Sequence, residues 1–156
     1  MGTDIHIVIE RRWRDKWVGV RSDHGFSRGS YRADTPSDWA APAVGQRDYG
    51  FFSRLAGVRG DGPAPDGVPH DASDMALALL GGWDGDAHSM GHLPLAEFAM
   101  RWCAGDPEFL ANMTAERLAG PDTMYSHLLD RASIGAFDFY DDTPVEDFRV
   151  VFWFDN

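Results

Sequence analysis

The chain has 156 residues, 44% of them hydrophobic and 13% aromatic, which fits one globular domain and excludes a disordered tail. Its net charge is −11, from 14 Lys and Arg against 25 Asp and Glu, so the surface as a whole repels nucleic acid and anionic membranes. No apolar run approaches the roughly 20 residues of a membrane helix, and the N-terminus lacks the features of a signal peptide. We therefore expect a single domain over residues 1–156, located in the cytoplasm.

The first predicted element is a strand over residues 4–10, in which three isoleucines alternate with Asp4, His6, Val8 and Glu10. A period of two is typical of a strand with one buried face. Asp4 and His6 lie two residues apart, so their side chains point to the same side of the strand. The polar residues between Trp13 and Trp17 then predict a turn, and residues 16–21 complete a hairpin.

Basic residues are concentrated in and after this hairpin, although the chain as a whole is acidic. On strands and a following loop, such a cluster is more typical of a solvated rim than of a phosphate-binding track. Residues 22–46, rich in Ser, Asp, Gly and Pro, predict a long loop. A loop of this length inside a small domain usually contacts a ligand or a partner.

The middle of the chain predicts helices separated by loops. Asp48 is a suitable N-cap for a helix that ends at Gly57, and residues 73–80 predict a second short helix. We expect loops at residues 59–71 and 83–92. Pro94 predicts the start of a third helix that runs to about Cys103, and two further helices are expected to start near residues 106 and 121.

Residues 148–156 predict a last strand, rich in aromatic and β-branched residues and suited to the centre of a sheet. Its natural partner is the first strand, because the hairpin occupies only one of that strand's edges. The sequence therefore predicts an α+β fold. Its small, mainly antiparallel sheet consists of the N-terminal hairpin and the C-terminal strand, with helices on one face and long loops across the other.

Asp4 and His6 are the first candidate site, because a carboxylate and an imidazole on one strand face can share a divalent metal ion or a substrate proton. A hydrogen-bonded pair facing a neighbouring strand or loop is the structural alternative. In the last strand, Asp155 is predicted on the side opposite the phenylalanines, which could be the side of Asp4 and His6. Its distance from them depends on the pairing register.

Asp86 and His88 repeat the same spacing in a glycine-containing loop, and such ligands suit Mn, Mg, Zn or Fe. The alternative is turn chemistry, since Asp and Gly build loops for backbone reasons. Arg47 is a candidate clamp for a phosphate or carboxylate, and Tyr49 is a candidate hydrogen-bond donor beside it. Helix capping by Asp48, with Tyr49 packed, is the structural interpretation of that segment.

Four blocks resemble an uncharacterised family found in tailed bacteriophages and prophages, whose members begin Met-Gly-Cys-Asp-Ile-His and carry a central Asp-Gly-His-Ser-His-Ser-Trp. The blocks in this chain are residues 1–6, 47–59, 86–89 and 150–156. Thr3 replaces the usual cysteine and Met90 stands where a second histidine is expected. The resemblance implies a phage origin and a shared set of polar residues: Asp4, His6, Arg47, Asp48, Arg59, Asp86, His88 and Asp155.

Two functions follow as hypotheses. In the first, a phage accessory enzyme performs metal-assisted hydrolysis of a phosphorylated or nucleotide-like small molecule. Asp4, His6 and His88 would be catalytic, the metal ligands would be Asp4, His6, Asp86 and His88, and Arg47, Tyr49 and Arg59 would bind the anion. In the second, a non-catalytic host-takeover or anti-defence protein binds a bacterial protein or sequesters a signalling nucleotide. Nucleic acid and membrane are not expected partners.

Overall fold

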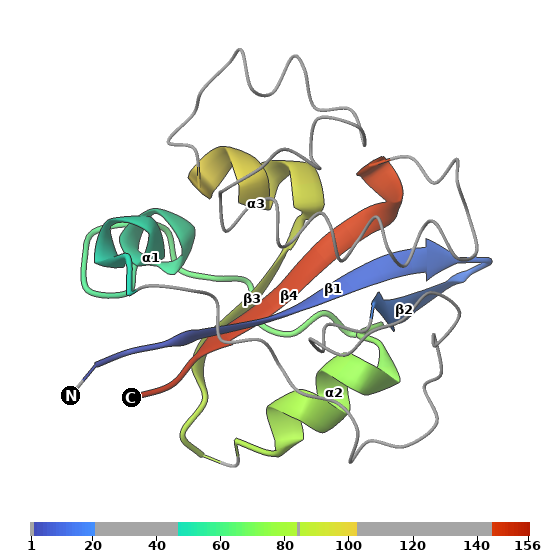
Figure 1. Ribbon diagram of the computed structural model, residues 1–156, viewed down its shortest axis with the longest axis horizontal. Helices are drawn as coiled ribbons and strands as arrows, with labels where there is room; N and C mark the ends of the chain where they lie inside the picture. Colours follow the sequence, from blue (N-terminus) through green and yellow to red (C-terminus); the bar gives the residue numbers. More distant parts are fainter. Residues whose placement is uncertain (1, 21–46, 84, 103–144) are drawn as a thin grey trace.

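The computed structural model describes residues 2–20, 47–83, 85–102 and 145–156. The predicted loop over 22–46, the expected helices near 106 and 121, and Cys103 lie outside these residues. Within them the fold is α+β, as predicted, with a four-stranded antiparallel sheet and three α-helices (Figure 1). No described helix is both long and apolar enough to cross a membrane.

The sheet has the strand order β2-β1-β4-β3. β1 (Ile5–Trp13) and β2 (Lys16–Val20) form the predicted hairpin, with Arg14 in the left-handed region at its turn. β4 (Phe148–Phe154) follows a short 3-10 helix, η2 (Val145–Asp147), and pairs with β1 as predicted. The last strand of the chain is therefore a central strand of the sheet.

β3 (His88–Pro94) pairs with the other edge of β4 and corrects the prediction of a loop over residues 83–92. Its sequence lacks an alternating apolar pattern, and a bulge lies between His88 and Gly91. A Cβ at Gly91 would lie 2.5 Å from the Phe152 ring and 2.8 Å from Pro65. β3 is held by backbone pairing with β4 and by the close approach of Gly91 to Phe152 and Pro65. These contacts leave no hydrophobic periodicity in the sequence.

Helices cover both faces of the sheet, which corrects the expectation of helices on one face only (Figure 1). α1 (Tyr49–Ala56) and α3 (Leu95–Trp102) pack on the face that carries the alternating isoleucines of β1. α2 (Asp74–Gly81) packs on the opposite face, against Val8, Val151 and Trp153. β1 is consequently buried on both sides from Ile5 to Arg11 and is not the half-exposed strand that its pattern predicted.

The helix caps match the sequence signals. The Asp48 carboxylate accepts a hydrogen bond from the Phe51 amide at 2.9 Å, and Gly57 ends α1 with φ of 67°. The Ser73 hydroxyl accepts one from the Ala76 amide at 3.1 Å at the start of α2. Side-chain acceptors at these positions satisfy amides that have no partner within the helix.

Candidate functional site

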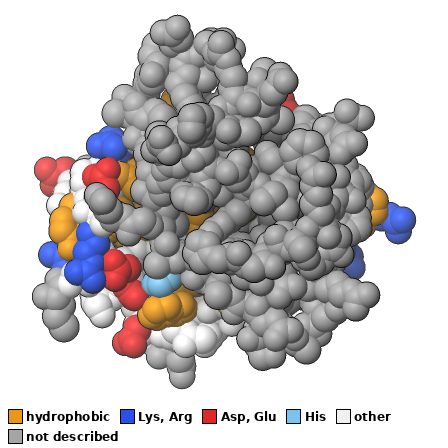
Figure 2. Space-filling view, viewed as in Figure 1, with side chains coloured by type: hydrophobic (Ala, Val, Ile, Leu, Met, Phe, Trp, Pro, Cys, Tyr) orange, Lys and Arg blue, Asp and Glu red, His pale blue; other side chains and the backbone are white. Residues whose placement is uncertain are grey.

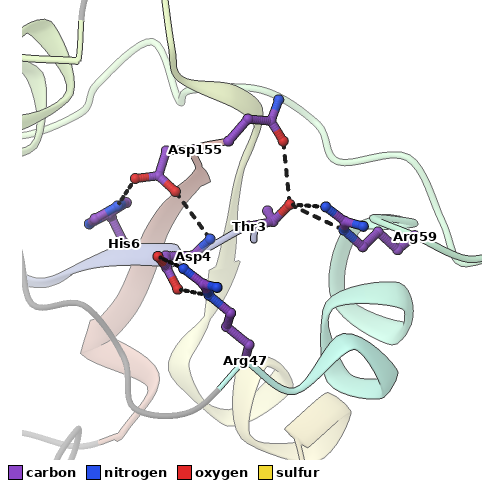
Figure 3. A network of polar contacts seen from close by, with 7 residues as sticks. Thr3, Asp4, His6, Arg47, Arg59 and Asp155 are labelled. Carbon is purple, nitrogen blue, oxygen red and sulfur yellow. Dashed lines mark hydrogen bonds and ion pairs between the residues drawn. The ribbon is translucent and has the colours of Figure 1, made fainter. Parts of the chain in front are cut away.

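The ends of β1 and β4 hold together a set of polar side chains that we call the terminal cluster (Figure 3). The antiparallel register sets His6 opposite Trp153 and Ile5 opposite Phe154. Residues just before β1 therefore meet residues just after β4, and the Asp155 amide donates to the Asp4 carbonyl at 3.1 Å. The cluster's members are Thr3, Asp4, His6, Arg47, Arg59, Asp155 and Asn156.

Buried His6 and partly buried Asp155 form the inner part of the cluster. The His6 Nε2 atom lies 3.1 Å from Oδ2 of Asp155, while Oδ1 of the same carboxylate accepts from the Asp4 amide at 3.1 Å. The predicted side for Asp155 is confirmed. Because an ionised carboxylate only accepts hydrogen bonds, this contact favours the tautomer with the proton on Nε2, in which Nδ1 carries the lone pair.

The imidazole of His6 is enclosed by indoles. Its ring centroid lies 4.2 Å from that of Trp83 and 5.7 Å from that of Trp153, and His6 is 5% exposed. Nδ1 of His6 and Nε1 of Trp153 are buried and have no hydrogen-bond partner among the described residues. A buried polar atom without a partner costs free energy, so a donor supplied to Nδ1 would be stabilising.

Asp4 is held by Arg47 in a two-pronged ion pair at the surface. Nε and Nη2 of Arg47 donate to the two carboxylate oxygens at 2.8 and 3.0 Å. This hydrogen bonding and the guanidinium charge lower the pKa of Asp4, and they raise the pKa of Arg47. The backbone of Gly2 lies against the same guanidinium, where an added Cβ would approach Nη1 to 1.8 Å.

Arg59 forms the other exposed edge of the cluster. Its Nε and Nη2 both lie 3.2 Å from the Thr3 hydroxyl, which donates to the Asn156 side chain at 3.3 Å. The guanidinium carbon of Arg59 lies 4.9 Å from the centre of the Tyr49 ring. Thr3 is 1% exposed, and its hydroxyl forms a hydrogen-bonding bridge between Arg59 and Asn156.

The structure brings together five residues that the sequence singled out as site or block positions. These are Asp4, His6, Arg47, Arg59 and Asp155. Tyr49 joins them through its ring alone. Figure 2 shows acidic and basic side chains beside a histidine at the left of the view, on the side where Figure 1 places both chain ends.

His88 lies apart from this cluster. It is opposite Phe154 in the sheet and stacks on that ring, with centroids 6.1 Å apart, on the face covered by α1 and α3. His6 faces the other way, toward Trp153 and α2. The Nδ1 atom of His88 pairs with the Ser89 hydroxyl at 3.0 Å, and Asp86 is exposed in the turn before β3.

The described residues contain no group of three or more His, Cys, Asp or Glu side chains placed to hold one metal ion. The bulge in β3 and the two-sided burial of β1 explain why Asp86 and His88 do not join Asp4 and His6. A divalent metal ion as cofactor, with those four ligands, stays a prediction from the sequence.

Sequence reasoning missed a second polar group, in the core. Glu10 is fully buried, and its carboxylate accepts from the Arg149 guanidinium and, at 2.6 Å, from the Ser73 amide. Arg149 also donates to the Asp71 carboxylate at 2.7 Å and lies over the Trp17 ring at 4.2 Å. The available signal was a Glu and an Arg at opposed positions of the two strands predicted to pair.

Comparison with protein-family models, with curated proteins and with solved structures finds no match for this chain. The geometry of the terminal cluster therefore carries the functional argument.

Proposed function

We propose that this protein is a small bacteriophage accessory enzyme that acts in the cytoplasm of the host bacterium. In this proposal it hydrolyses a phosphorylated or nucleotide-like small molecule at the terminal cluster. The observation that supports the proposal is the contact between His6 Nε2 and Asp155 Oδ2, combined with a buried Nδ1 that has no partner among the described residues. A histidine oriented through one nitrogen by a carboxylate is a common arrangement for a general base.

In the proposed reaction, Nδ1 of His6 accepts a proton from the attacking water, whose oxygen bonds to phosphorus. The ester P–O bond breaks, its electron pair stays on the departing oxygen, and that oxygen takes the proton back from His6. Asp155 stabilises the imidazolium ion between these two transfers. Arg47 and Arg59 would bind the phosphoryl oxygens. They lie just before and just after α1 in the sequence.

A divalent metal ion remains part of the proposal, since it would polarise the phosphoryl oxygen. Asp4 would be its ligand in the cluster, because Nδ1 of His6 serves as the base in the proposed reaction and Nε2 contacts Asp155. Asp86 and His88, the further ligands predicted from the sequence, lie apart from the cluster. Because Arg47 holds both oxygens of the Asp4 carboxylate, metal binding would require this ion pair to open.

A second candidate function is non-catalytic. The two arginines of the cluster already contact Asp4 and Thr3, and the His6 ring is 5% exposed, which also suits a structural lock between the chain ends. A protein of this kind would act by binding a host protein or by sequestering a signalling nucleotide, as a host-takeover or anti-defence factor.

The test is a hydrolysis assay on a panel of nucleotides and phosphomonoesters, with Mn²⁺, with Mg²⁺ and with a chelator. If the proposal holds, His6→Gln lowers kcat/KM for the best substrate by about a hundredfold or more, as expected for loss of a general base. Asp155→Asn gives a smaller loss and shifts the pH profile. His92→Gln is the matched control, because the Nδ1 atom of His92 donates to the Gly67 carbonyl, away from the cluster.

If the wild-type protein hydrolyses none of these compounds under any of the metal conditions, the proposed enzymatic function is contradicted. Calorimetric binding of one nucleotide without turnover would then support the sequestering function. Full activity in a folded His6→Gln variant would remove His6 from the mechanism.

A further inference from the structure

The turn of the β1–β2 hairpin carries a surface whose charge is opposite to that of the whole chain. Its exposed residues, which we call the hairpin tip, are Arg12, Trp13, Arg14, Asp15 and Lys16. Three cations and one anion lie within five consecutive residues of a protein with a net charge of −11. Lys16 is, in addition, the single lysine of the chain.

The tip combines this charge with aromatic surface. Trp13 is 39% exposed and is one of two large hydrophobic residues exposed among those the structure describes. The Arg14 guanidinium lies 5.2 Å from the centre of the Trp13 ring, and that of Arg12 lies 4.8 Å from the centre of the Trp17 ring. Stacking on indoles restricts the arginine side chains before any partner arrives, which lowers the entropy cost of binding.

The backbone conformation at Arg14, in the turn of the hairpin, is one that arginine adopts at a cost. Arg14 has a φ of 49°, a left-handed conformation that glycine or asparagine adopts at lower cost. An arginine at this position gives up some stability and places a guanidinium at the extreme end of the hairpin. A two-residue hairpin turn uses positive φ, and this chain carries an arginine at that position of the turn.

We propose that the hairpin tip is a docking site for an acidic segment of a protein partner. Arginine and tryptophan are the residues most enriched among energetic hot spots of protein interfaces, and the cations of the tip complement Asp and Glu side chains. The tip lies at the far end of β1 from the terminal cluster, about 30 Å away for a strand of nine residues, so this site is separate from the proposed active site (Figure 1).

Charge and stacking favour a protein partner over a nucleic acid. Three exposed cations can neutralise few phosphates, and the net charge of −11 opposes the long anionic track of a strand. The indoles of the hairpin are already stacked by guanidiniums, because Trp17 contacts both Arg12 and Arg149 and Trp13 contacts Arg14. Base stacking, which supplies much of the affinity for single strands, would have to displace these contacts.

The experiment measures the fluorescence anisotropy of labelled poly-L-glutamate, and separately of labelled oligothymidylate, as the full-length protein is titrated in at low salt. We expect the protein to bind poly-L-glutamate, and more weakly as salt rises, because the contacts are exposed charges. Arg12→Glu combined with Arg14→Glu should weaken binding by about tenfold or more, whereas Asp15→Lys should strengthen it. Arg54→Glu is the control, with an exposed arginine changed in the same way on α1.

Arg14→Gly separates binding from folding. Glycine relieves the left-handed backbone at this position, so the melting temperature should stay the same or rise while poly-L-glutamate binding falls by about fivefold. A carbodiimide crosslink between the Lys16 amine and the glutamate carboxylates should form in the wild-type complex. It should disappear in Lys16→Arg, which keeps the charge and the affinity.

Three outcomes would overturn the proposal. The first is oligothymidylate binding in the absence of poly-L-glutamate binding. The second is no binding of either polymer, and the third is an Arg54→Glu variant that loses as much affinity as the tip variants do.

Discussion

At the scale of single residues, the ion pair of Glu10 and Arg149 is the most demanding feature of the fold. Glu10 is 0% exposed and Arg149 is 7% exposed, between a sheet and a helix. The pair is tolerated because its atoms are engaged, since Glu10 also accepts from the Ser73 amide and Arg149 also donates to Asp71. Glu10 thereby links the centre of the sheet to Ser73, the N-cap residue of α2.

Breaking this pair should be costly. Glu10→Gln leaves the Arg149 guanidinium buried without its main counter-charge, so we expect the free energy of unfolding to fall by about 3–5 kcal/mol. Urea denaturation followed by tryptophan fluorescence measures this change.

Glu97→Gln is the matched control, because Glu97 pairs with Arg101 at 2.8 Å at the partly exposed surface of α3. A surface pair of this spacing contributes about 0.3–0.5 kcal/mol. Equal effects of the two substitutions would show that burial of Glu10 is not what makes its pairing important.

At the scale of elements, short helices are positioned by their ends. α1 and α2 have eight residues each, too few to be stable in isolation, so caps and packing hold them. Gly57 ends α1 with φ of 67°, and a Cβ there would approach the Gly62 carbonyl oxygen to 2.8 Å. Gly81 is the last residue of α2, and a Cβ there would meet nothing within 4 Å.

These two glycines give opposite predictions for the same substitution. Gly57→Ala should lower the free energy of unfolding by about 1 kcal/mol or more, because it adds left-handed strain to a backbone clash. Gly81→Ala should raise it by about 0.5–1 kcal/mol, because alanine loses less backbone entropy in a helix. Thermal melts of both variants test these two predictions. Stabilisation by Gly57→Ala would contradict the cap geometry of α1.

Local signals in the sequence predict the elements whose pattern is local. Asp48, Gly57 and Ser73 mark the ends of α1 and α2 correctly. The alternation in the last strand predicts which of its side chains share a face, and the free edge of the first strand predicts its partner. The pairing then brings Asp155 to His6. The sequence does not predict β3, because a strand held by backbone pairing around a bulge has no side-chain period.

The candidate site is predictable only as far as the sheet is. Asp4 and Arg47 are 43 residues apart, and nothing in either segment alone specifies their contact. His88 was grouped with His6 by chemistry, and the bulge sends it to the opposite face. A period of two predicts one exposed face for the first strand, the face that carries Glu10, and does not reveal that a second helix covers it.

At the scale of the whole molecule, ion pairs of two partly exposed carboxylates connect segments that are distant in sequence. Asp4–Arg47 joins the start of β1 to the entry of α1, and Asp71–Arg149 joins the segment before α2 to β4. Hydrogen bonds from these arginines lower the pKa values of Asp4 and Asp71 below the ordinary carboxyl range. Ionisation of both carboxylates therefore makes a modest contribution to the stability of the fold.

The sign of the pH dependence follows. When a folded-state pKa is depressed, the unfolded chain binds the proton first as pH falls, so the stabilisation is complete above about pH 4 and is lost as pH falls through the folded pKa. We expect the melting temperature to fall below that range, and Asp71→Asn to make the fall shallower. Asp66→Asn is the control, since exposed Asp66 has no ion pair among the described residues. An equal change in both variants would contradict this assignment.

The position of β4 has a consequence for biosynthesis. It lies between β1 and β3, yet it follows both of them in the chain. Until residues 148–154 are available, β1 keeps one hydrogen-bonding edge open and β3 has no strand partner on either edge, and open edges invite pairing with other nascent chains. The pairing of β1 with β4 brings the polar residues at positions 3–6 to those at 155–156, so the terminal cluster forms only after residues 148–156 have been synthesised.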